Sequence, residues 1–191
     1  MDGRRDPVNV LFLAGGFGTR LQRDIAADAD FAHLSNIPKA LVPLNSRPLL
    51  DHWIDQLEGH NLFLQSNDLF YPDFVNWAEL KGNDVRIQIK SNGIQGNDTR
   101  LGSVGDIAFA LDSFAISDSD LVVVAGDTLF LKDFDFSEFL SMSKKNPDAV
   151  IVTCYEAEES AVTKSGILEL DSRSMVCSFL EKPSLEDTRY N

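Results

Sequence analysis

Cysteine is nearly absent from this sequence. Cys154 and Cys177 are the only two among 191 residues, and they form neither a metal-ligand spacing nor the disulfide framework of a small secreted domain. The charged first residues are not followed by an apolar segment with a cleavage site, so we expect no secretory signal. A reducing, cytoplasmic setting is therefore the expected location.

Basic side chains and long apolar runs are also in short supply. The sequence has 17 Lys and Arg residues against 30 Asp and Glu residues, which gives a formal net charge of -13. Nucleic acid and anionic membranes need clustered positive charge, so neither is expected as a partner. The apolar runs are much shorter than the roughly 20 residues that span a bilayer. A small anionic ligand stays possible, because a few local donors are enough to bind it.

Hydrophobic residues, at 43%, supply ample material for one core. We expect a flexible leader over residues 1–7 and one domain over residues 8–191. Strand and helix patterns alternate, which predicts an α/β fold with a mostly parallel sheet. Expected strands cover residues 8–14, 61–65, 85–89, 121–125 and 149–155, with a hairpin of 166–170 and 176–180. Expected helices begin at residue 48 and cover 71–80, 103–114 and 137–145, and residues 22–36 show weak helical character.

Two of these elements carry a specific expectation about burial. The helix over residues 103–114 has Val104, Ile107, Ala108 and Leu111 at helical spacing, so we expect them to face the core. The strand over residues 121–125 is the most apolar of the chain and is expected to be buried.

A glycine-rich turn follows the first predicted strand. It reads Gly15-Gly-Phe-Gly-Thr-Arg20. Glycines allow a tight bend and a close approach of main-chain N–H groups, which together bind anions, and the Arg20 guanidinium suits phosphate oxygens. The turn lacks the Gly-Lys-Ser/Thr of a P-loop and the last small residue of a dinucleotide fingerprint, since position 21 is Leu. The alternative is a tight strand-to-helix turn without a ligand.

Two further residues could contact the same ligand if they lie beside this turn. Lys39 follows Pro38 and can reach a phosphate as a point charge, although alone it is more typical of a solvated surface. Asp127 follows Gly126 directly after the strand over residues 121–125, where a carboxylate can hold Mg²⁺ or simply start a turn. Because ligands of parallel sheets lie at the carboxyl ends of strands, we expect Asp127 and the glycine turn to be neighbours.

A third group lies near the end of the chain. Glu181 and Lys182 precede Pro183, and Gly166 opens the preceding strand of the predicted hairpin. A carboxylate and an ammonium can contact the hydroxyl and phosphate of a sugar phosphate. The alternative is a charged strand end with no ligand.

Five segments occur in an order that resembles one known family. They are residues 13–21, 38–43, 48–50, 126–127 and 181–183, and the resemblance runs from Val8 to Pro183. It is to the sugar-1-phosphate nucleotidyltransferases, which include glucose-1-phosphate thymidylyl- and uridylyltransferases and mannose-1-phosphate guanylyltransferases. The resemblance implies a Rossmann-like three-layer α/β/α nucleotide-diphospho-sugar transferase fold with a mostly parallel mixed sheet. It also implies a Mg²⁺-dependent reaction of a nucleoside triphosphate (NTP) with a sugar 1-phosphate, giving a nucleoside-diphosphate sugar and pyrophosphate.

The resemblance also implies residue roles. Arg20, Lys39 and Asp127 would be catalytic, with Asp127 on the metal. The sugar phosphate would meet Gly166, Glu181 and Lys182. The nucleotide would be bound by residues of the glycine turn and of a second glycine-containing segment: Leu13, Ala14, Gly15, Gly16, Gly18, Thr19, Gly102 and Ser103.

The sequence departs from the family pattern in three respects. Eighteen residues separate Arg20 from Lys39, a longer interval than the family's, and residues 91–101 form an expanded loop. The family also supplies a second metal-binding aspartate well after the Glu-Lys-Pro segment, and Asp187 comes too soon to match it. We therefore expect the C-terminal part of the family domain to be absent. Two functions stay open, an enzyme and a catalytically weak nucleotide-sugar-binding or regulatory member. The base, the sugar and a possible homo-oligomer are not fixed by the sequence.

Overall fold

The computed structural model describes residues 7–82, 85–117, 119–130, 134–154 and 158–187. The chain divides into two compact units, Met1–Phe136 and Ser137–Asn191. We call them the N-terminal unit and the C-terminal unit and describe each by itself. No helix in the described ranges is long and apolar enough to cross a membrane.

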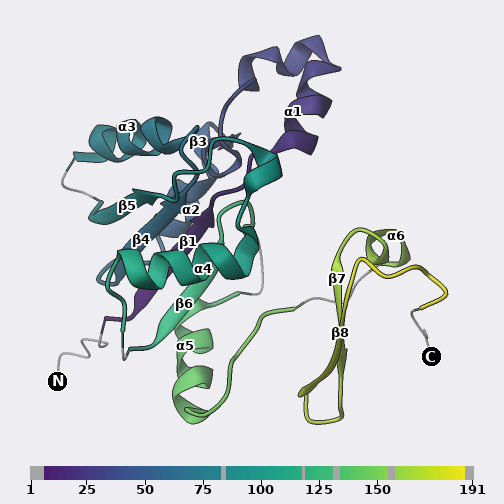
Figure 1. The fold of residues 1–191 in the computed structure, drawn as a ribbon. Helices are drawn as coiled ribbons and strands as arrows, with labels where there is room; N and C mark the ends of the chain where they lie inside the picture. Colours follow the sequence, from purple (N-terminus) through teal and green to yellow (C-terminus); the bar gives the residue numbers. More distant parts are fainter. Residues whose placement is uncertain (1–6, 83–84, 118, 131–133, 155–157, 188–191) are drawn as a thin grey trace. The chain divides into compact units, whose positions relative to one another are not determined.

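A four-stranded parallel sheet forms the centre of the N-terminal unit (Figure 1). Its strands are β1 (Asn9–Ala14), β4 (Asn61–Ser66), β5 (Ile87–Ser91) and β6 (Leu121–Ala125), in the order β5-β4-β1-β6. β1 lies inside the sheet, and its residues Val10, Leu11 and Phe12 have no exposed surface. An unbroken apolar run is the pattern expected of a parallel strand covered on both faces.

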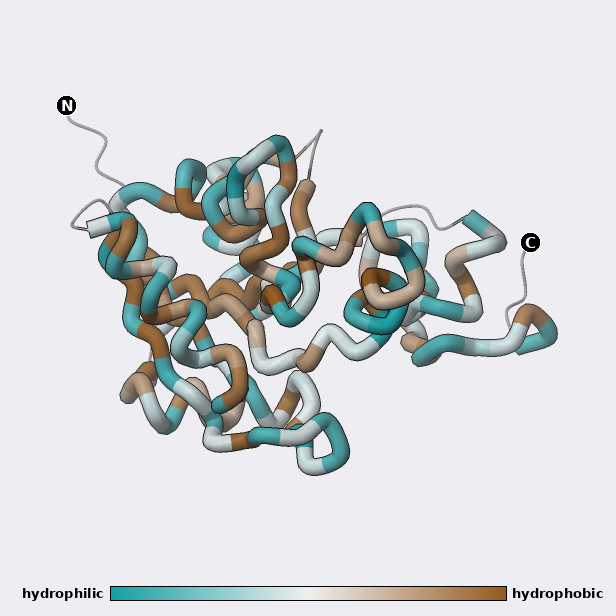
Figure 2. The backbone as a smooth tube through the Cα atoms, turned by 90° about the horizontal axis from the view of Figure 1, so that it is seen from above, coloured by the Kyte–Doolittle hydropathy of each residue, from teal (hydrophilic) through white to brown (hydrophobic). Residues whose placement is uncertain are grey.

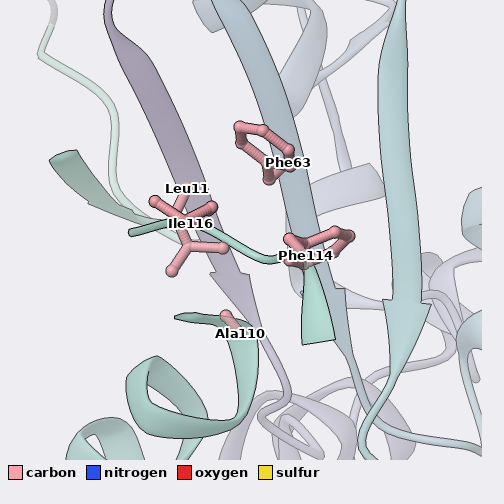
Figure 3. Close-up of a cluster of buried hydrophobic side chains, with 5 residues drawn as sticks. All are labelled: Leu11, Phe63, Ala110, Phe114 and Ile116. Carbon is pink, nitrogen blue, oxygen red and sulfur yellow. The ribbon is translucent and has the colours of Figure 1, made fainter. Parts of the chain in front are cut away.

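Helices cover the two faces of this sheet. α4 (Gly102–Ser113) packs on one face, where Leu11 and Phe63 join Ala110, Phe114 and Ile116 in a buried cluster (Figure 3). On the other face, Phe12 meets Trp53 of α2 (Leu49–Ile54) edge to face, with ring centroids 6.5 Å apart. Alternate residues of β1 thus pack against the helices on opposite faces of the sheet, as the pleat of a strand requires. The α/β fold with a parallel sheet is therefore confirmed.

The remaining elements of the N-terminal unit connect these layers. Figure 2 shows hydrophobic stretches alternating with hydrophilic connections along its backbone. The connecting elements are α1 (Thr19–Ala26), the 3-10 helices η1 (Ala29–Leu34), η2 (Lys39–Leu41) and η4 (Asn97–Thr99), the two-residue strands β2 (Pro43–Leu44) and β3 (Arg47–Pro48), and α3 (Tyr71–Lys81).

The C-terminal unit contains the predicted hairpin. β7 (Gly166–Leu170) pairs antiparallel with β8 (Val176–Glu181), and the turn is closed by the Asp171 side chain, which accepts from the N–H groups of Arg173 and Met175. α6 (Glu159–Val162) precedes the hairpin, and α5 (Phe136–Lys145) begins at the last residue of the N-terminal unit.

Three sequence expectations about packing are wrong. On α4, Val104 is 82% exposed, and Asp106 and Ala110 are the buried residues. The helix places its small Ala110 against the sheet, a choice of face that apolar spacing alone did not reveal. In β6 only Val124 is buried, because β6 pairs with β1 alone among the described strands.

The third error concerns the strand expected over residues 149–155. Residues 149–154 form no strand, and Val150 is exposed. They have no ladder partner in the described ranges, so their apolar sequence is not enough to make a strand. Position 155 lies outside the described residues.

Candidate nucleotide-binding site

The glycine turn and Asp127 lie side by side at the carboxyl edge of the sheet. The N–H of Gly126 donates to the carbonyl of Leu13 over 2.9 Å. A Cβ at Gly126 would come within 2.8 Å of that same oxygen, so the approach of the two segments depends on glycine. The expected neighbourhood of the two strand ends is thereby confirmed.

The glycines of the turn have different surroundings. A Cβ at Gly15 would lie 2.8 Å from Gln65 Nε2 and 2.9 Å from Asp106 Oδ2, whereas a Cβ at Gly16 would meet nothing within 4 Å. Gly18 has a φ of 62° and caps the start of α1. The turn is therefore tightly packed beneath Gly15 and open at Gly16.

Lys39 returns to the glycine turn despite its distance in sequence. Gln22 of α1 accepts from the Asn36 N–H over 2.8 Å and donates to the Ile37 carbonyl over 3.2 Å, which ties the segment before Lys39 to the helix. A Cβ at Gly18 would lie 3.4 Å from Lys39 Cγ. The eighteen intervening residues thus fold back.

The ammonium of Lys39 completes this contact by pairing with Asp127. Lys39 Nζ lies 3.0 Å from Asp127 Oδ2, and the two side chains are 39% and 48% exposed. A half-exposed pair of this kind contributes little to stability. It holds a cation and a carboxylate beside the glycine turn, where either can exchange its partner for a ligand.

The turn that carries Asp127 is fixed from below. The Thr128 N–H donates to the Ala125 carbonyl, and the Thr128 carbonyl accepts from Trp53 Nε1 over 2.7 Å. Trp53 is 2% exposed. The hydrogen bond from this buried indole therefore holds the main chain next to Asp127 in place.

Arg20 is the second residue of α1 and is exposed. In the described part of the chain it forms no ion pair. Its guanidinium is therefore free to bind an anion near the glycine turn.

Gly102 and Ser103 open α4 and are both exposed. One turn further along, Asp106 lies against the Gly15 position, so the start of α4 approaches the glycine turn. Burial raises the pKa of the Asp106 carboxyl, and a hydrogen bond from Asn92 Nδ2, 2.8 Å away, opposes that rise.

The residues expected on the sugar phosphate gather within the C-terminal unit. Gly166 stands opposite Glu181 in the hairpin register, and a Cβ at Gly166 would lie 2.7 Å from the Phe179 ring. Lys182 Nζ lies 2.7 Å from Glu181 Oε1. Lys182 has a φ of 47°, a left-handed conformation that is uncommon for a side-chain-bearing residue, and its N–H donates to the Ser165 carbonyl. The binding roles of these residues, like those of the N-terminal unit, stay predictions.

A metal ion would depend here on oxygens from a substrate. Among the described residues no group of three or more His, Cys, Asp or Glu side chains could hold one. Asp187 is engaged locally, since Ser184 Oγ donates to its carboxylate over 2.6 Å and thereby lowers the pKa of Asp187. The single carboxylate of Asp127 would suit a Mg²⁺ ion whose other ligands include phosphate oxygens of a substrate.

The comparisons with known proteins identify the family of this chain. The sequence model described as nucleotidyl transferase matches residues 9–191. The chain belongs to the nucleotidyl transferase family. The resemblance seen in the sequence motifs is thus confirmed.

Relatives in this family share about a quarter of the sequence of this chain. It is 26% identical over 182 residues to a putative mannose-1-phosphate guanyltransferase of Sulfolobus acidocaldarius, covering 92% of this chain and 44% of the relative. It is 26% identical to a probable mannose-1-phosphate guanylyltransferase 1 of Oryza sativa subsp. japonica, covering 93% and 46%. The chain therefore spans less than half the length of these curated relatives.

A solved structure supports the fold. The crystal structure of HddC from Yersinia pseudotuberculosis matches with a TM-score of 0.62 at 25% identity, covering 93% of this chain and 70% of the other.

Sequence reasoning missed the buried polar residues that support the site. Gln65, Ser66 and Asn67 follow the apolar part of β4 and have no exposed surface. The signal was present, because polar residues directly after an apolar strand stand at the carboxyl edge, next to the glycine turn. Gln22 and Trp53 gave no comparable signal, since their partners are main-chain groups of distant residues.

One pocket among the described residues lies away from this site. It has a volume of about 1230 Å³ and includes residues at the amino ends of β4 and β5, the opposite edge of the sheet. None of the predicted site residues lines it.

Proposed function

We propose that this member of the nucleotidyl transferase family makes a nucleoside-diphosphate sugar and pyrophosphate from an NTP and a sugar 1-phosphate. The observation that carries the proposal is the convergence of Lys39 and Asp127 beside the glycine turn. Arg20 follows that turn at the start of α1 and has no ion-pair partner among the described residues. Glycine N–H groups, an ammonium and a guanidinium are the donors that a triphosphate needs.

The proposed chemistry requires no general base. A phosphate oxygen of the sugar 1-phosphate is already a nucleophile; it forms a bond to the α-phosphorus as the bond to the departing pyrophosphate breaks. Catalysis then consists of in-line positioning and neutralisation of charge. Arg20 takes the charge that builds on pyrophosphate, and Lys39 assists on the triphosphate.

The proposed metal is Mg²⁺ held by Asp127 and phosphate oxygens of the substrate. When bound, it supplies charge neutralisation at the phosphates. Lys39 neutralises Asp127 in the structure, so Lys39 would be released toward the triphosphate as the substrate arrives.

The sugar phosphate is proposed to meet the group of the C-terminal unit. Glu181 would accept from a sugar hydroxyl, and Lys182 would hold the phosphate. Gly166 would lie beside them, at a position where a Cβ would strike the Phe179 ring. The names of the relatives make GTP and mannose 1-phosphate the first pair to try.

The test is pyrophosphate release in the presence of Mg²⁺, with a panel of NTPs and sugar 1-phosphates. The proposal predicts release for at least one pair and none when either substrate is omitted. A rise in melting temperature with nucleotide but no release for any pair would favour the binding or regulatory alternative. No release and no stabilisation by any nucleotide would contradict both.

A further inference from the structure

Asn67 stands directly beside the glycine turn and has no exposed surface. It follows the last residue of β4, and Gly15 follows the last residue of the neighbouring β1. Its side-chain amide donates to the Gly15 carbonyl over 3.1 Å and makes a longer contact of 3.5 Å with the Gly16 carbonyl. Its side-chain oxygen accepts from the Phe70 N–H over 2.9 Å.

These partners fix which way the Asn67 amide faces. One end meets an N–H group, which requires an oxygen, and the other meets carbonyl oxygens, which require the NH₂ group. The contact with Phe70 closes the turn that leads into α3. The contacts with Gly15 and Gly16 serve the glycine turn alone.

The orientation of two carbonyls determines the orientation of the next two N–H groups. A trans peptide is planar, and its C=O and N–H point in opposite directions; no cis peptide occurs in the described residues. Because the Gly15 and Gly16 carbonyls face Asn67, the N–H groups of Gly16 and Phe17 face away from it. In the described ranges neither N–H has a protein acceptor, and the space at Gly16 is open.

We propose that Asn67 is a positioning residue that turns the N–H groups of Gly16 and Phe17 toward the ligand phosphates. The proposal rests on the proposed function, which makes the glycine turn a triphosphate site. Two successive N–H groups on one side form an anion nest, and a buried amide that holds both carbonyls gives that nest a fixed shape before the ligand arrives.

The critical variant is Asn67→Asp. It keeps the size of the side chain and the acceptor for Phe70, but it removes the donor to Gly15 and Gly16 and sets a carboxylate against their oxygens. Asn61→Asp is the matched control, since it adds the same charge at the exposed first residue of β4. Asn67→Ser is a second variant without added charge, whose hydroxyl is too short to span both carbonyls.

The first measurement is binding of inorganic tripolyphosphate, followed through the amide signals of the wild-type protein by NMR. The proposal predicts that the signals of Gly16 and Phe17 shift on binding. It predicts that Asn67→Asp and Asn67→Ser weaken binding about tenfold or more, since aligned hydrogen bonds to a charged group are worth at least that factor, while Asn61→Asp stays close to wild type.

Steady-state kinetics distinguish a positioning role of Asn67 from a general loss of structure in the variants. With folded variants, the KM for the NTP rises while the KM for the sugar 1-phosphate stays within about twofold, because a local change in N–H orientation affects one substrate only. Unshifted Gly16 and Phe17 signals in a wild-type protein that binds tripolyphosphate would overturn the inference, even if no variant folds. Equal binding by wild type and both Asn67 variants would overturn it as well. A wild-type protein that binds neither tripolyphosphate nor any NTP would instead remove the proposed function on which the inference rests.

Discussion

Two adjacent glycines in the same turn have opposite tolerance for a side chain. A Cβ at Gly15 would lie within 3 Å of Gln65 and Asp106, and Gln65 is fully buried and has no room to withdraw. We expect Gly15→Ala to lower the free energy of unfolding by about 1–3 kcal/mol, as overpacking of a dense site does.

Gly16→Ala is the control, because its Cβ would enter open space. We expect its free energy of unfolding to change by less than about 0.5 kcal/mol. Denaturant titration of both variants measures the difference, and equal losses would show that the contacts beneath Gly15 are not what restricts the turn.

Asp106 makes the stability of the N-terminal unit depend on pH. Burial raises the pKa of its carboxyl, so the folded protein holds the proton more tightly than the unfolded chain does. Stability from this residue is therefore present at acidic pH and is lost as pH rises through the raised pKa. We expect Asp106→Asn, which keeps an acceptor for Asn92, to be more stable than the parent at pH 7, and the gain to shrink on acidification.

Melting temperatures at pH 7 and at the lowest pH where both proteins stay folded measure this effect. A gain of the same size at both pH values, or a loss at pH 7, would contradict the assignment of the raised pKa to Asp106.

The position of a residue was predictable where its side-chain chemistry and its place in the sequence both indicated the same site. The sequence placed Asp127 beside the glycine turn, and the structure brings Lys39 there too. Asn67 was missed because its role depends on the register between β4 and β1, which sequence periodicity does not give. Roles in binding, as opposed to positions, stay predictions for all of them.

At the scale of elements, a buried carboxylate joins α2 to α3. Asp51 is 4% exposed and accepts from Trp77 Nε1 over 2.9 Å and from Lys81 Nζ over 2.5 Å. Removing it leaves a buried donor and an ammonium without their acceptor. We expect Asp51→Ala to cost about 2–3 kcal/mol of the free energy of unfolding, at the lower end for a buried pair because Lys81 can reach water.

Asp55 provides a matched comparison one turn later in the sequence. It is 57% exposed and pairs with Arg47 over 2.9 Å. Asp55→Ala should cost less than about 1 kcal/mol. A cost for Asp51→Ala as small as that for Asp55→Ala, in urea unfolding curves, would show that the buried network does not couple the two helices.

The type of an element was easier to predict than its packing. The apolar run of β1 and the hairpin of β7 and β8 follow directly from residue pattern and turn chemistry. The buried face of α4 was assigned wrongly, because Asp106 and Ala110 lie toward the sheet while the more apolar Val104 is exposed. A polar residue that packs under a glycine turn is not recognisable from hydrophobic spacing.

At the scale of the whole molecule, a net charge of -13 coexists with the proposed site for anions. The positive groups are local: Arg20 and Lys39 lie near N–H groups of the glycine turn, so the bulk charge does not decide the ligand. The family match covers residues 9–191, and the glycine turn lies at the carboxyl edge of the parallel sheet.

The proposed role of Arg20 in holding the departing pyrophosphate can be measured by comparing two arginines of α1. Arg23 is 76% exposed and pairs with Asp24, so Arg23→Ala controls for loss of charge on the same helix. With the substrate pair that gives most pyrophosphate, Arg20→Ala should lower kcat by about 10²–10³-fold with an unchanged melting temperature, the effect of losing one preorganised donor to a developing anion. Arg23→Ala should stay within about twofold of wild type. Near-normal pyrophosphate release by Arg20→Ala would contradict the account.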